Sequence, residues 1–270
     1  MEIWTIANQK GGVGKTTTAV NLGGMLADLD RRVLLIDLDP HGSMTSYFGF
    51  DPDSIEESVY DLFHADLVNK RSPLAALLRH TSVGGMDLLP ACTALVSLDR
   101  RIAGRDGMGL VLRNALAKYD GYYQHVIIDC PPTLGILMIN ALAACQKLLI
   151  PVQTEFLAIK GLERMLNTLK MIIMSGKHSL DYLVVPTMFD VRTRASKLAL
   201  DSLQKNYHER LWPDVIPIDT RFRESSRMGR VTHQVFPNSR GVEAYSRLLH
   251  TLLLGDQQPC SRNEVSRCQT

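Results

Sequence analysis

A glycine-rich segment near the amino terminus, residues 10–17, has the residue types of a phosphate-binding loop. It follows the apolar run 3–7, which has the length of a strand, and precedes residues 18–29, where apolar side chains recur at helical spacing. A strand that turns through glycines into a helix directs backbone N–H groups and the positive end of the helix dipole at one point, which suits a polyphosphate. This context favours a phosphate cradle over a solvated turn. The residues that we expect to contact a nucleotide here are Lys10, Gly11, Gly12, Val13, Gly14, Lys15, Thr16 and Thr17.

Two side chains at the end of this loop have the chemistry for a magnesium nucleotide. Lys15 can neutralise phosphate charge, and the hydroxyl of Thr16 can ligate Mg²⁺. The loop departs from the general pattern G-x-x-x-x-G-K-[ST], because Gln9 stands where the pattern has its first glycine. It also carries a second lysine, Lys10, at its start.

Two apolar stretches end in the carboxylates that nucleotide hydrolysis needs. Residues 33–36 precede Asp37 and Asp39, and residues 126–128 precede Asp129. Because ligands of open parallel sheets bind at the carboxyl ends of the strands, we expect three strand ends to meet at one site. Asp129 is then expected to orient Mg²⁺, Asp39 to orient the attacking water, and Asp37 to hold either the loop or a lysine. The predicted metal-site residues are Thr16, Asp39 and Asp129.

These segments resemble the ParA/MinD family of deviant Walker ATPases. The similarity lies in K-G-G-V-G-K-T-T at 10–17, in the segment 37–49 and in D-C-P-P at 129–132. Later blocks at residues 151–162, 190–194, 224–229 and 239–245 agree as well, so the resemblance covers roughly residues 1–254.

The resemblance implies a P-loop ATPase that dimerises face to face around two ATP molecules. Lys15 would bind the β- and γ-phosphates in its own subunit, while Lys10 would reach across the two-fold interface to the nucleotide of the partner. Lys10, Lys15 and Asp39 would be the catalytic residues. His41 departs from the family, in which glutamine is common at this place. It either alters the loop that contains it and Asp39, the switch loop, or is a solvated loop residue.

Within the family, residues 39–49 look most like the ParA-like proteins encoded with chemotaxis genes (ParC), which position chemoreceptor arrays. The resemblance then implies slow hydrolysis stimulated by a partner, with an adaptor or chemotaxis-array proteins as partners. Plasmid and chromosome partition ATPases share the same catalytic residues, so partition remains an alternative, as does a pure scaffold. A third alternative is a metabolic ATP-dependent amidoligase of cobyrinate type. Against it stand the length of the chain, which leaves no room for a glutaminase domain, and the partition-type block at 192–194.

Composition predicts one large α/β domain. A chain of 270 residues with 45% hydrophobic residues can bury a sizeable core, and strand and helix signals alternate. We therefore expect a doubly wound, mostly parallel sheet flanked by helices over residues 1–254, followed by a disordered tail at 255–270. The five cysteines are scattered and the sequence contains no long apolar run, which together favour a cytoplasmic protein with reduced thiols.

The second half of the chain is expected to supply the base pocket. Residues 184–186 and 215–217 have the pattern of two further strands, whose ends flank the adenine ring in the family that the chain resembles. Met188, Phe189 and Pro217 are the candidates for the base pocket. Residues 110–119 are predicted to form a helix, and residues 162–174 a largely buried one.

A net charge of +2 does not by itself indicate a nucleic-acid partner, but four arginines gather within ten residues. They are Arg221, Arg223, Arg227 and Arg230. Partition ATPases of this family hold DNA non-specifically through basic surface residues, and phosphate contacts need charge without base reading. The alternative is a solvated face with ion pairs to Asp219 and Glu224. The last apolar segment, 245–254, lacks a lysine-rich face, so we expect a packed helix there and not a membrane anchor.

Overall fold

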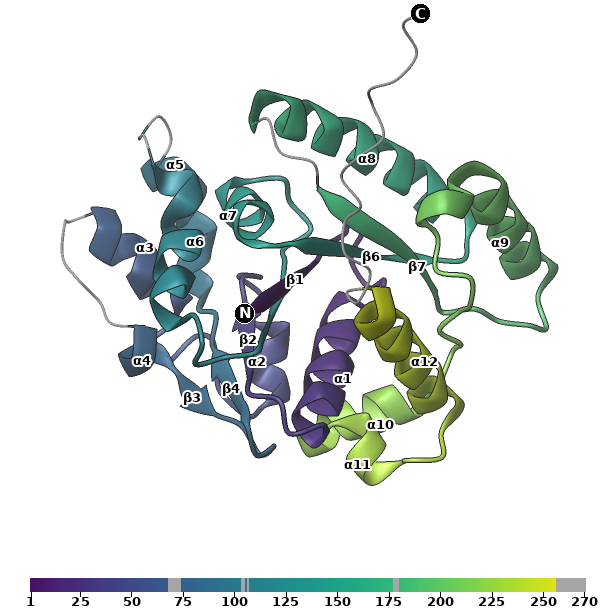
Figure 1. Ribbon diagram of the computed structural model, residues 1–270, viewed down its shortest axis with the longest axis horizontal. Helices are drawn as coiled ribbons and strands as arrows, with labels where there is room; N and C mark the ends of the chain where they lie inside the picture. Colours follow the sequence, from purple (N-terminus) through teal and green to yellow (C-terminus); the bar gives the residue numbers. More distant parts are fainter. Residues whose placement is uncertain (68–73, 103–104, 106, 177–179, 256–270) are drawn as a thin grey trace, which may run out of the picture.

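A sheet with the strand order β3-β4-β2-β5-β1-β6-β7 runs through the middle of the protein (Figure 1). The computed structural model describes residues 1–67, 74–102, 105, 107–176 and 180–255. Its strands are β1 (Glu2–Ile6), β2 (Val33–Asp37), β3 (Arg79–His80), β4 (Met86–Leu89), β5 (His125–Asp129), β6 (Lys147–Gln153) and β7 (Asp181–Thr187). Neighbouring strands pair in parallel except for β3 with β4, so the predicted doubly wound, mostly parallel α/β fold is confirmed.

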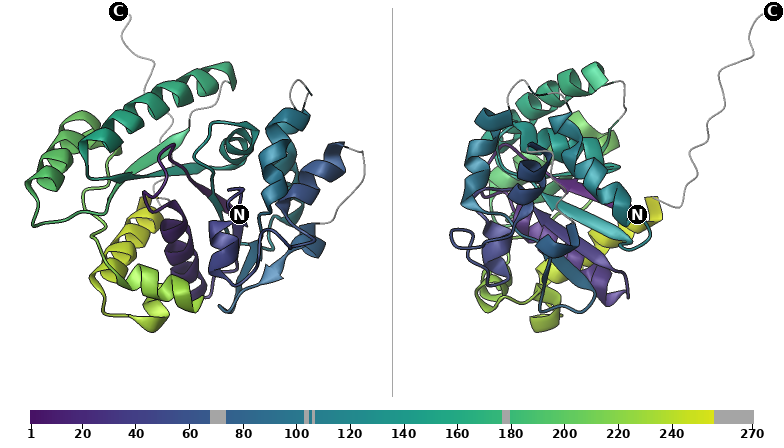
Figure 2. Two further views of the ribbon diagram at one scale, coloured as in Figure 1. Left: turned by 180° about the vertical axis from the view of Figure 1, so that it is seen from behind. Right: turned by 90° about the vertical axis from the view of Figure 1, so that its left-hand side faces the viewer.

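Helices cover both faces of this sheet. Figure 1 shows α1 and α12 on one side of β6 and β7, and α7 and α8 on the other, and the view from behind in Figure 2 shows the same layers. The helices are α1 (Lys15–Asp28), α2 (Ser43–Tyr47), α3 (Val59–Leu67), α4 (Leu74–Leu77), α5 (Leu98–Ile102), α6 (Val111–Leu116), α7 (Ile136–Ala144), α8 (Phe156–Gly176), α9 (Arg194–Tyr207), α10 (Arg221–Met228), α11 (Thr232–Val235) and α12 (Arg240–Gly255). No helix among the described residues is long and apolar enough to cross a membrane.

Successive side chains of the central strands are buried on opposite faces. Ile3 belongs to the core that contains residues of α7 and α8, whereas Trp4 and Ile6 belong to the core that contains residues of α1 and α12. β2 and β5 alternate in the same way. Because both faces are buried, these strands appear in the sequence as continuous apolar runs without polar alternation.

The carboxyl ends of β1, β5 and β2 lie side by side. Ile6 at the end of β1 is the register partner of Asp129, and Asp129 is in turn the register partner of Asp37. The loops that follow β1 and β2 therefore begin at the edge of the sheet where Asp129 lies. The prediction that three strand ends meet is confirmed.

Three predicted elements differ in the structure. Residues 215–217 form a single bridge, from Pro217 to Phe189, and no strand, because proline has no N–H with which to continue a ladder. The helix predicted at 110–119 is shorter, since α6 covers only Val111–Leu116 between two 3₁₀ turns. The helix predicted at 162–174 is part of α8, whose Met171 is 65% exposed, so this helix is amphipathic. Of the predicted tail, residues 256–270 lie outside the described residues.

Candidate nucleotide-binding site

The glycine-rich loop borders open space where a phosphate would lie. Gly12 and Gly14 have φ angles of 73° and 91°, in the left-handed region that favours glycine. A Cβ added at either position, or at Gly11, would meet no heavy atom within 4 Å. Because α1 begins at Lys15, directly after the loop, the free N–H groups of its first turn face the same region. The backbone thus has the form that a phosphate cradle needs.

Distant segments brace this loop. The side-chain amide of Asn8 donates to the carbonyl oxygen of Pro151 at 2.7 Å, and its Oδ1 accepts from the N–H of Lys10 at 3.0 Å. The hydroxyl of Thr187, at the end of β7, donates to the carbonyl oxygen of Val13 at 2.9 Å. Sequence analysis missed Asn8 and Thr187, because Pro151 and Val13, to which they donate, lie far along the chain and no motif marks them.

Lys15, Thr16 and Asp129 meet at the start of α1. The Thr16 hydroxyl donates to Asp129 Oδ2 at 2.6 Å, while Asp129 Oδ1 is buried and has no hydrogen-bond partner among the residues that the structure describes. Lys15 is only 7% exposed, and no group in the described part of the chain accepts a hydrogen bond from its ammonium. A buried polar atom without a partner is costly, so Asp129 Oδ1 suits a ligand that pairs with it, and the Lys15 ammonium, which has no acceptor among the described residues, can pair with the same ligand.

The side chains around Asp129 fit a Mg²⁺ ion. Burial, and next the charge of Asp37, raises the pKa of Asp129 to about 8, while the Thr16 hydroxyl and Lys15 act in the opposite direction. Among the described residues, no three His, Cys, Asp or Glu side chains form a group that could hold a metal. Mg²⁺ does not need such a cage, because it binds through one or two protein ligands together with substrate phosphates and water. Thr16 Oγ1 and Asp129 Oδ1 can supply the protein ligands.

Asp37 holds the loop that follows β2. Its Oδ2 accepts from the backbone N–H and the hydroxyl of Thr45 at 2.9 and 2.8 Å, and its Oδ1 accepts from the N–H of Asp39 at 3.1 Å. Burial raises the pKa of Asp37 to about 6 in spite of these hydrogen bonds. Of the two roles predicted for it, these contacts favour holding the loop over holding a lysine.

Asp39 and His41 form a hydrogen-bonded pair beside the site. Asp39 Oδ1 accepts from the backbone N–H of His41 at 3.0 Å and lies 2.8 Å from His41 Nδ1. Asp39 has no hydrogen bond to Thr16 or Asp129, although its charge contributes to the raised pKa of Asp129. The His41 side chain is 80% exposed but bound to Asp39, which favours the alternative in which it affects the switch loop, through the Asp39 carboxylate, over that of a solvated residue.

Lys10 is folded back onto its own chain. Its ammonium pairs with the carboxylate of Glu155 and donates to Gln153 Oε1 at 3.1 Å, both at or just beyond the end of β6. The resemblance places Lys10 across a two-fold interface instead. In the conformation described here, its charge is neutralised within the subunit.

The comparisons with known proteins agree with this geometry. A family model described as AAA domain matches residues 1–182. The sporulation initiation inhibitor protein Soj of Bacillus subtilis is 37% identical over 250 residues, which cover 90% of this chain and 95% of that protein. The chromosome-partitioning ATPase Soj of Thermus thermophilus is 38% identical over 254 residues, which cover 94% and 96%. The chain belongs to the ParA/Soj family of P-loop ATPases.

Solved structures with the same fold include relatives with different names. Cobyrinic acid a,c-diamide synthase from Mycobacterium smegmatis, with bound ATP analogue and magnesium, is 35% identical with a TM-score of 0.80 and 94% of each chain covered. The McdA–ATP complex from Cyanothece has a TM-score of 0.82 at 23% identity, covering 97% of this chain and 99% of that one, and shows the fold alone.

The candidate base-pocket residues of this ParA/Soj-family chain lie together. Phe189 and Pro217 form the bridge described above, and Met188 precedes Phe189 with a positive φ of 53°. Thr187, which braces the phosphate loop, is the next residue towards the amino terminus. Met188 and Phe189 therefore follow directly on a residue of the site, while their contact with a base remains a prediction.

The four arginines of α10 and its C-terminal end are all exposed, but they are not equivalent. Arg221 pairs with Glu224 at 2.8 Å and lies over the ring of Phe236, as the ion-pair alternative predicted. The guanidinium groups of the other three have no ion-pair partner among the described residues. These three, at spacings of four and three residues, are Arg223, Arg227 and Arg230.

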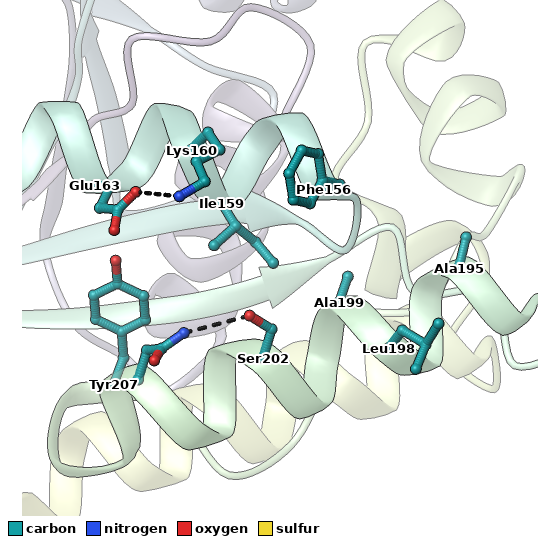
Figure 3. Close-up of a pocket in the computed structure, with 10 residues that line it drawn as sticks. Phe156, Ile159, Lys160, Glu163, Ala195, Leu198, Ala199, Ser202 and Tyr207 are labelled. Carbon is teal, nitrogen blue, oxygen red and sulfur yellow. Dashed lines mark hydrogen bonds and ion pairs between the residues drawn. The ribbon is translucent and has the colours of Figure 1, made fainter.

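A groove lies between α8 and α9 (Figure 3). It has a volume of about 410 Å³ and is lined largely by apolar side chains such as Phe156, Ile159 and Leu198. Lys160 at its rim pairs with Glu163 at 2.9 Å. Among its lining residues the groove therefore offers no free cation for a phosphate.

Proposed function

We propose that this protein is a nucleotide-switched ATPase that hydrolyses ATP to ADP and phosphate and uses the cycle to position a cargo in the cell. The observation that carries the proposal is the buried Asp129 Oδ1, which lacks a partner, together with the Lys15 ammonium, which has no acceptor among the described residues; both lie beside the glycine loop. ATP with Mg²⁺ supplies the partner that each of them lacks: phosphate oxygens for Lys15 and the metal, directly or through its water, for Asp129.

In this proposal each group of the site has a separate role in hydrolysis. The loop N–H groups and Lys15 hold the phosphates, while Thr16 and Asp129 hold Mg²⁺, which neutralises charge as it develops on the phosphoryl group. Asp39 orients the attacking water. Lys10 leaves Glu155 and reaches the nucleotide of a second subunit, so that the dimer forms only with ATP.

For the cargo, we propose chemoreceptor arrays, because residues 39–49 look most like the chemotaxis-linked members of the family. An adaptor or array protein would stimulate slow hydrolysis and reset the dimer. The protein would then act in the cytoplasm, at a cell pole or on the nucleoid through such a partner.

Chromosome or plasmid partition is a second candidate, with non-specific DNA as the surface. The three unpaired arginines of α10 and its C-terminal end support it, because exposed guanidinium groups without carboxylate partners are available to phosphates. The name of the Thermus thermophilus relative, chromosome-partitioning ATPase Soj, points in the same direction.

An amidoligase remains the metabolic alternative. The solved relative that carries a synthase name matches this chain over 94% of both lengths, so chain length does not separate the two classes as the sequence suggested. ATP hydrolysis that depends on a small carboxylic acid and ammonia, with an amide product, would favour this alternative over a switch.

The first experiment uses the Asp39→Ala variant with ATP and Mg²⁺. Loss of the water-orienting carboxylate should trap an ATP-bound dimer, which light scattering measures as a doubling of mass. Non-specific duplex DNA is titrated in at two salt concentrations. A dimer that binds DNA in a salt-sensitive manner supports partition on a DNA surface, and a dimer that ignores DNA supports an adaptor-based scaffold. A protein that stays monomeric at saturating ATP would contradict the switch.

The Lys10→Ala variant is the matched control for the dimer. It keeps Lys15 and the loop, so it should bind ATP normally and remain monomeric. Dimerisation of this variant with ATP would show that the cross-subunit role assigned to Lys10 is wrong.

A further inference from the structure

The carboxylate of Asp39 is held from one side by a single residue. Both the backbone N–H and the imidazole Nδ1 of His41 lie at hydrogen-bond distance from Asp39 Oδ1, at 3.0 and 2.8 Å. The two side chains differ in exposure, 12% for Asp39 and 80% for His41. The imidazole is therefore on the solvent side of the pair, while the carboxylate lies inward.

This contact decides which oxygen of Asp39 is available. With Oδ1 occupied twice, Oδ2 is left, and no group in the described part of the chain donates a hydrogen bond to it. The terminal torsion of an aspartate is broad, so a carboxylate with fewer contacts would turn more easily. The hydrogen bond from Nδ1 opposes that rotation.

The backbone around His41 is fixed without its side chain. The N–H of Asp39 is bound by Asp37 at 3.1 Å, and the N–H of Gly42 donates to the carbonyl oxygen of Asp39 at 2.8 Å. Gly42 has a φ of 58°, and a Cβ there would lie 2.5 Å from the Pro52 ring, so the turn is tightly enclosed. Replacing the imidazole should therefore leave the loop in place.

We infer that His41 is a positioning residue for ATP hydrolysis, holding Asp39 through Nδ1 so that Oδ2 faces the attacking water. The inference rests on the proposed function, in which Asp39 orients that water. It gives a role to the position at which this chain has histidine and its family commonly has glutamine. The effect belongs to the chemical step, because a misplaced catalytic group slows reaction without weakening the binding of phosphates by the loop.

The test compares His41→Ala with His41→Asn. An asparagine amide can place an N–H near the position of Nδ1, whereas alanine leaves only the backbone N–H of residue 41 to hold the carboxylate. Single-turnover hydrolysis of Mg²⁺-ATP should slow about tenfold in the alanine variant, as expected for the loss of one hydrogen bond to a charged group, with unchanged affinity for ATP. The asparagine variant should stay within about threefold of the parent protein, less than half the expected loss on a logarithmic scale.

His80 supplies the matched control. Its Nδ1 lies 2.7 Å from Asp87 Oδ1 and its side chain is 95% exposed, so it forms the same kind of pair on β3 and β4, away from the glycine loop. His80→Ala should hydrolyse ATP at the parent rate. Equal slowing by His80→Ala would show a general loss of stability and overturn the inference.

Two further results would overturn it. The first is an unchanged rate in His41→Ala, and the second is an asparagine variant as slow as the alanine variant. Asp39→Ala separates this failure from that of the proposed function. If Asp39→Ala is inactive while His41→Ala is normal, only the inference fails. If Asp39→Ala hydrolyses ATP at the parent rate, the role of Asp39 and the inference fall together.

Discussion

Two buried carboxyl groups of the site, Asp37 and Asp129, have raised pKa values. Burial raises both pKa values, to about 6 and about 8, from an unfolded value near 4. When folding raises the pKa of a carboxyl group, the group's contribution to stability is fully present at pH values below its pKa in the unfolded chain. This contribution is lost as the pH rises through its pKa in the folded protein. We therefore expect the nucleotide-free protein to lose stability between about pH 4 and about pH 8.

Asp129→Asn removes the larger part of this dependence, because the amide stays neutral at every pH in the range. Urea unfolding at about pH 5 and about pH 8, without Mg²⁺, should show a smaller decrease in the free energy of unfolding for the variant than for the parent. The difference should exceed about 1.4 kcal/mol, the equivalent of one pKa unit. Asp201→Asn, at an exposed position of α9, is the control and should follow the parent protein. Parallel curves for Asp129→Asn and the parent would contradict the raised pKa.

At the residue scale, the sequence predicted the residues of short local motifs better than it predicted contacts between residues far apart in the chain. Lys15, Thr16 and the glycines follow from one short motif, and Asp37 and Asp129 follow from their places at the ends of apolar strands. The pairing of Lys10 with Glu155 joins positions 145 residues apart, and nothing near either residue indicates it. Such contacts depend on how the strands are ordered, which a single sequence does not specify.

At the scale of elements, α2 connects the site with the arginine-bearing end of α10. Thr45 within α2 is bound by Asp37, and the hydroxyl of Tyr47 in its last turn donates to the carbonyl oxygen of Arg230 at 2.8 Å. A five-residue helix has little freedom when it is held at both ends. The switch loop and the candidate DNA-binding surface are therefore neighbours, although almost two hundred residues separate them in the sequence.

The end of β6 and the start of α8 hold Lys10, and a charge change there should alter assembly. Glu155→Gln keeps an acceptor for the lysine but removes the charge, so Lys10 should leave more readily for the nucleotide of a partner. An exposed ion pair contributes up to about 1 kcal/mol, which predicts a severalfold lower ATP concentration at half-maximal dimerisation. Light scattering during an ATP titration measures this shift.

Glu163→Gln is the control for that change. Glu163 also pairs with a lysine, Lys160, about two turns further along α8, and it has no contact with the phosphate loop. Its substitution should leave the ATP titration unchanged. An equal shift in both variants would attribute the effect to the net charge in and next to α8 and not to the release of Lys10.

At the scale of the whole molecule, the alternation of strands and helices was sufficient to predict the fold class and the edge of the sheet that carries the site. It was not sufficient for two short segments. The short edge strand β3 has too few residues to show a pattern, and the extended segment 215–217 looks like a strand although its proline limits it to one bridge. Whether a stretch pairs depends on the neighbour that the fold provides.

The surface at α10 allows a test of the DNA-binding candidate with a control on the same helix. Arg223 and Arg227 have no ion-pair partner in the described part of the chain, whereas the charge of Arg221 is already offset by Glu224. If DNA binds here, Arg223→Gln should weaken binding of the ATP-bound Asp39→Ala dimer and lower the slope of log affinity against log salt by about 1 for each subunit that contacts DNA.

Arg221→Gln removes the same formal charge but frees Glu224, so its effect comes from local charge and not from a lost phosphate contact. It should therefore shift affinity while changing the slope less than Arg223→Gln does. Equal slopes for the two variants would show that DNA responds only to net charge, and unchanged binding in Arg223→Gln would exclude this helix as the contact surface.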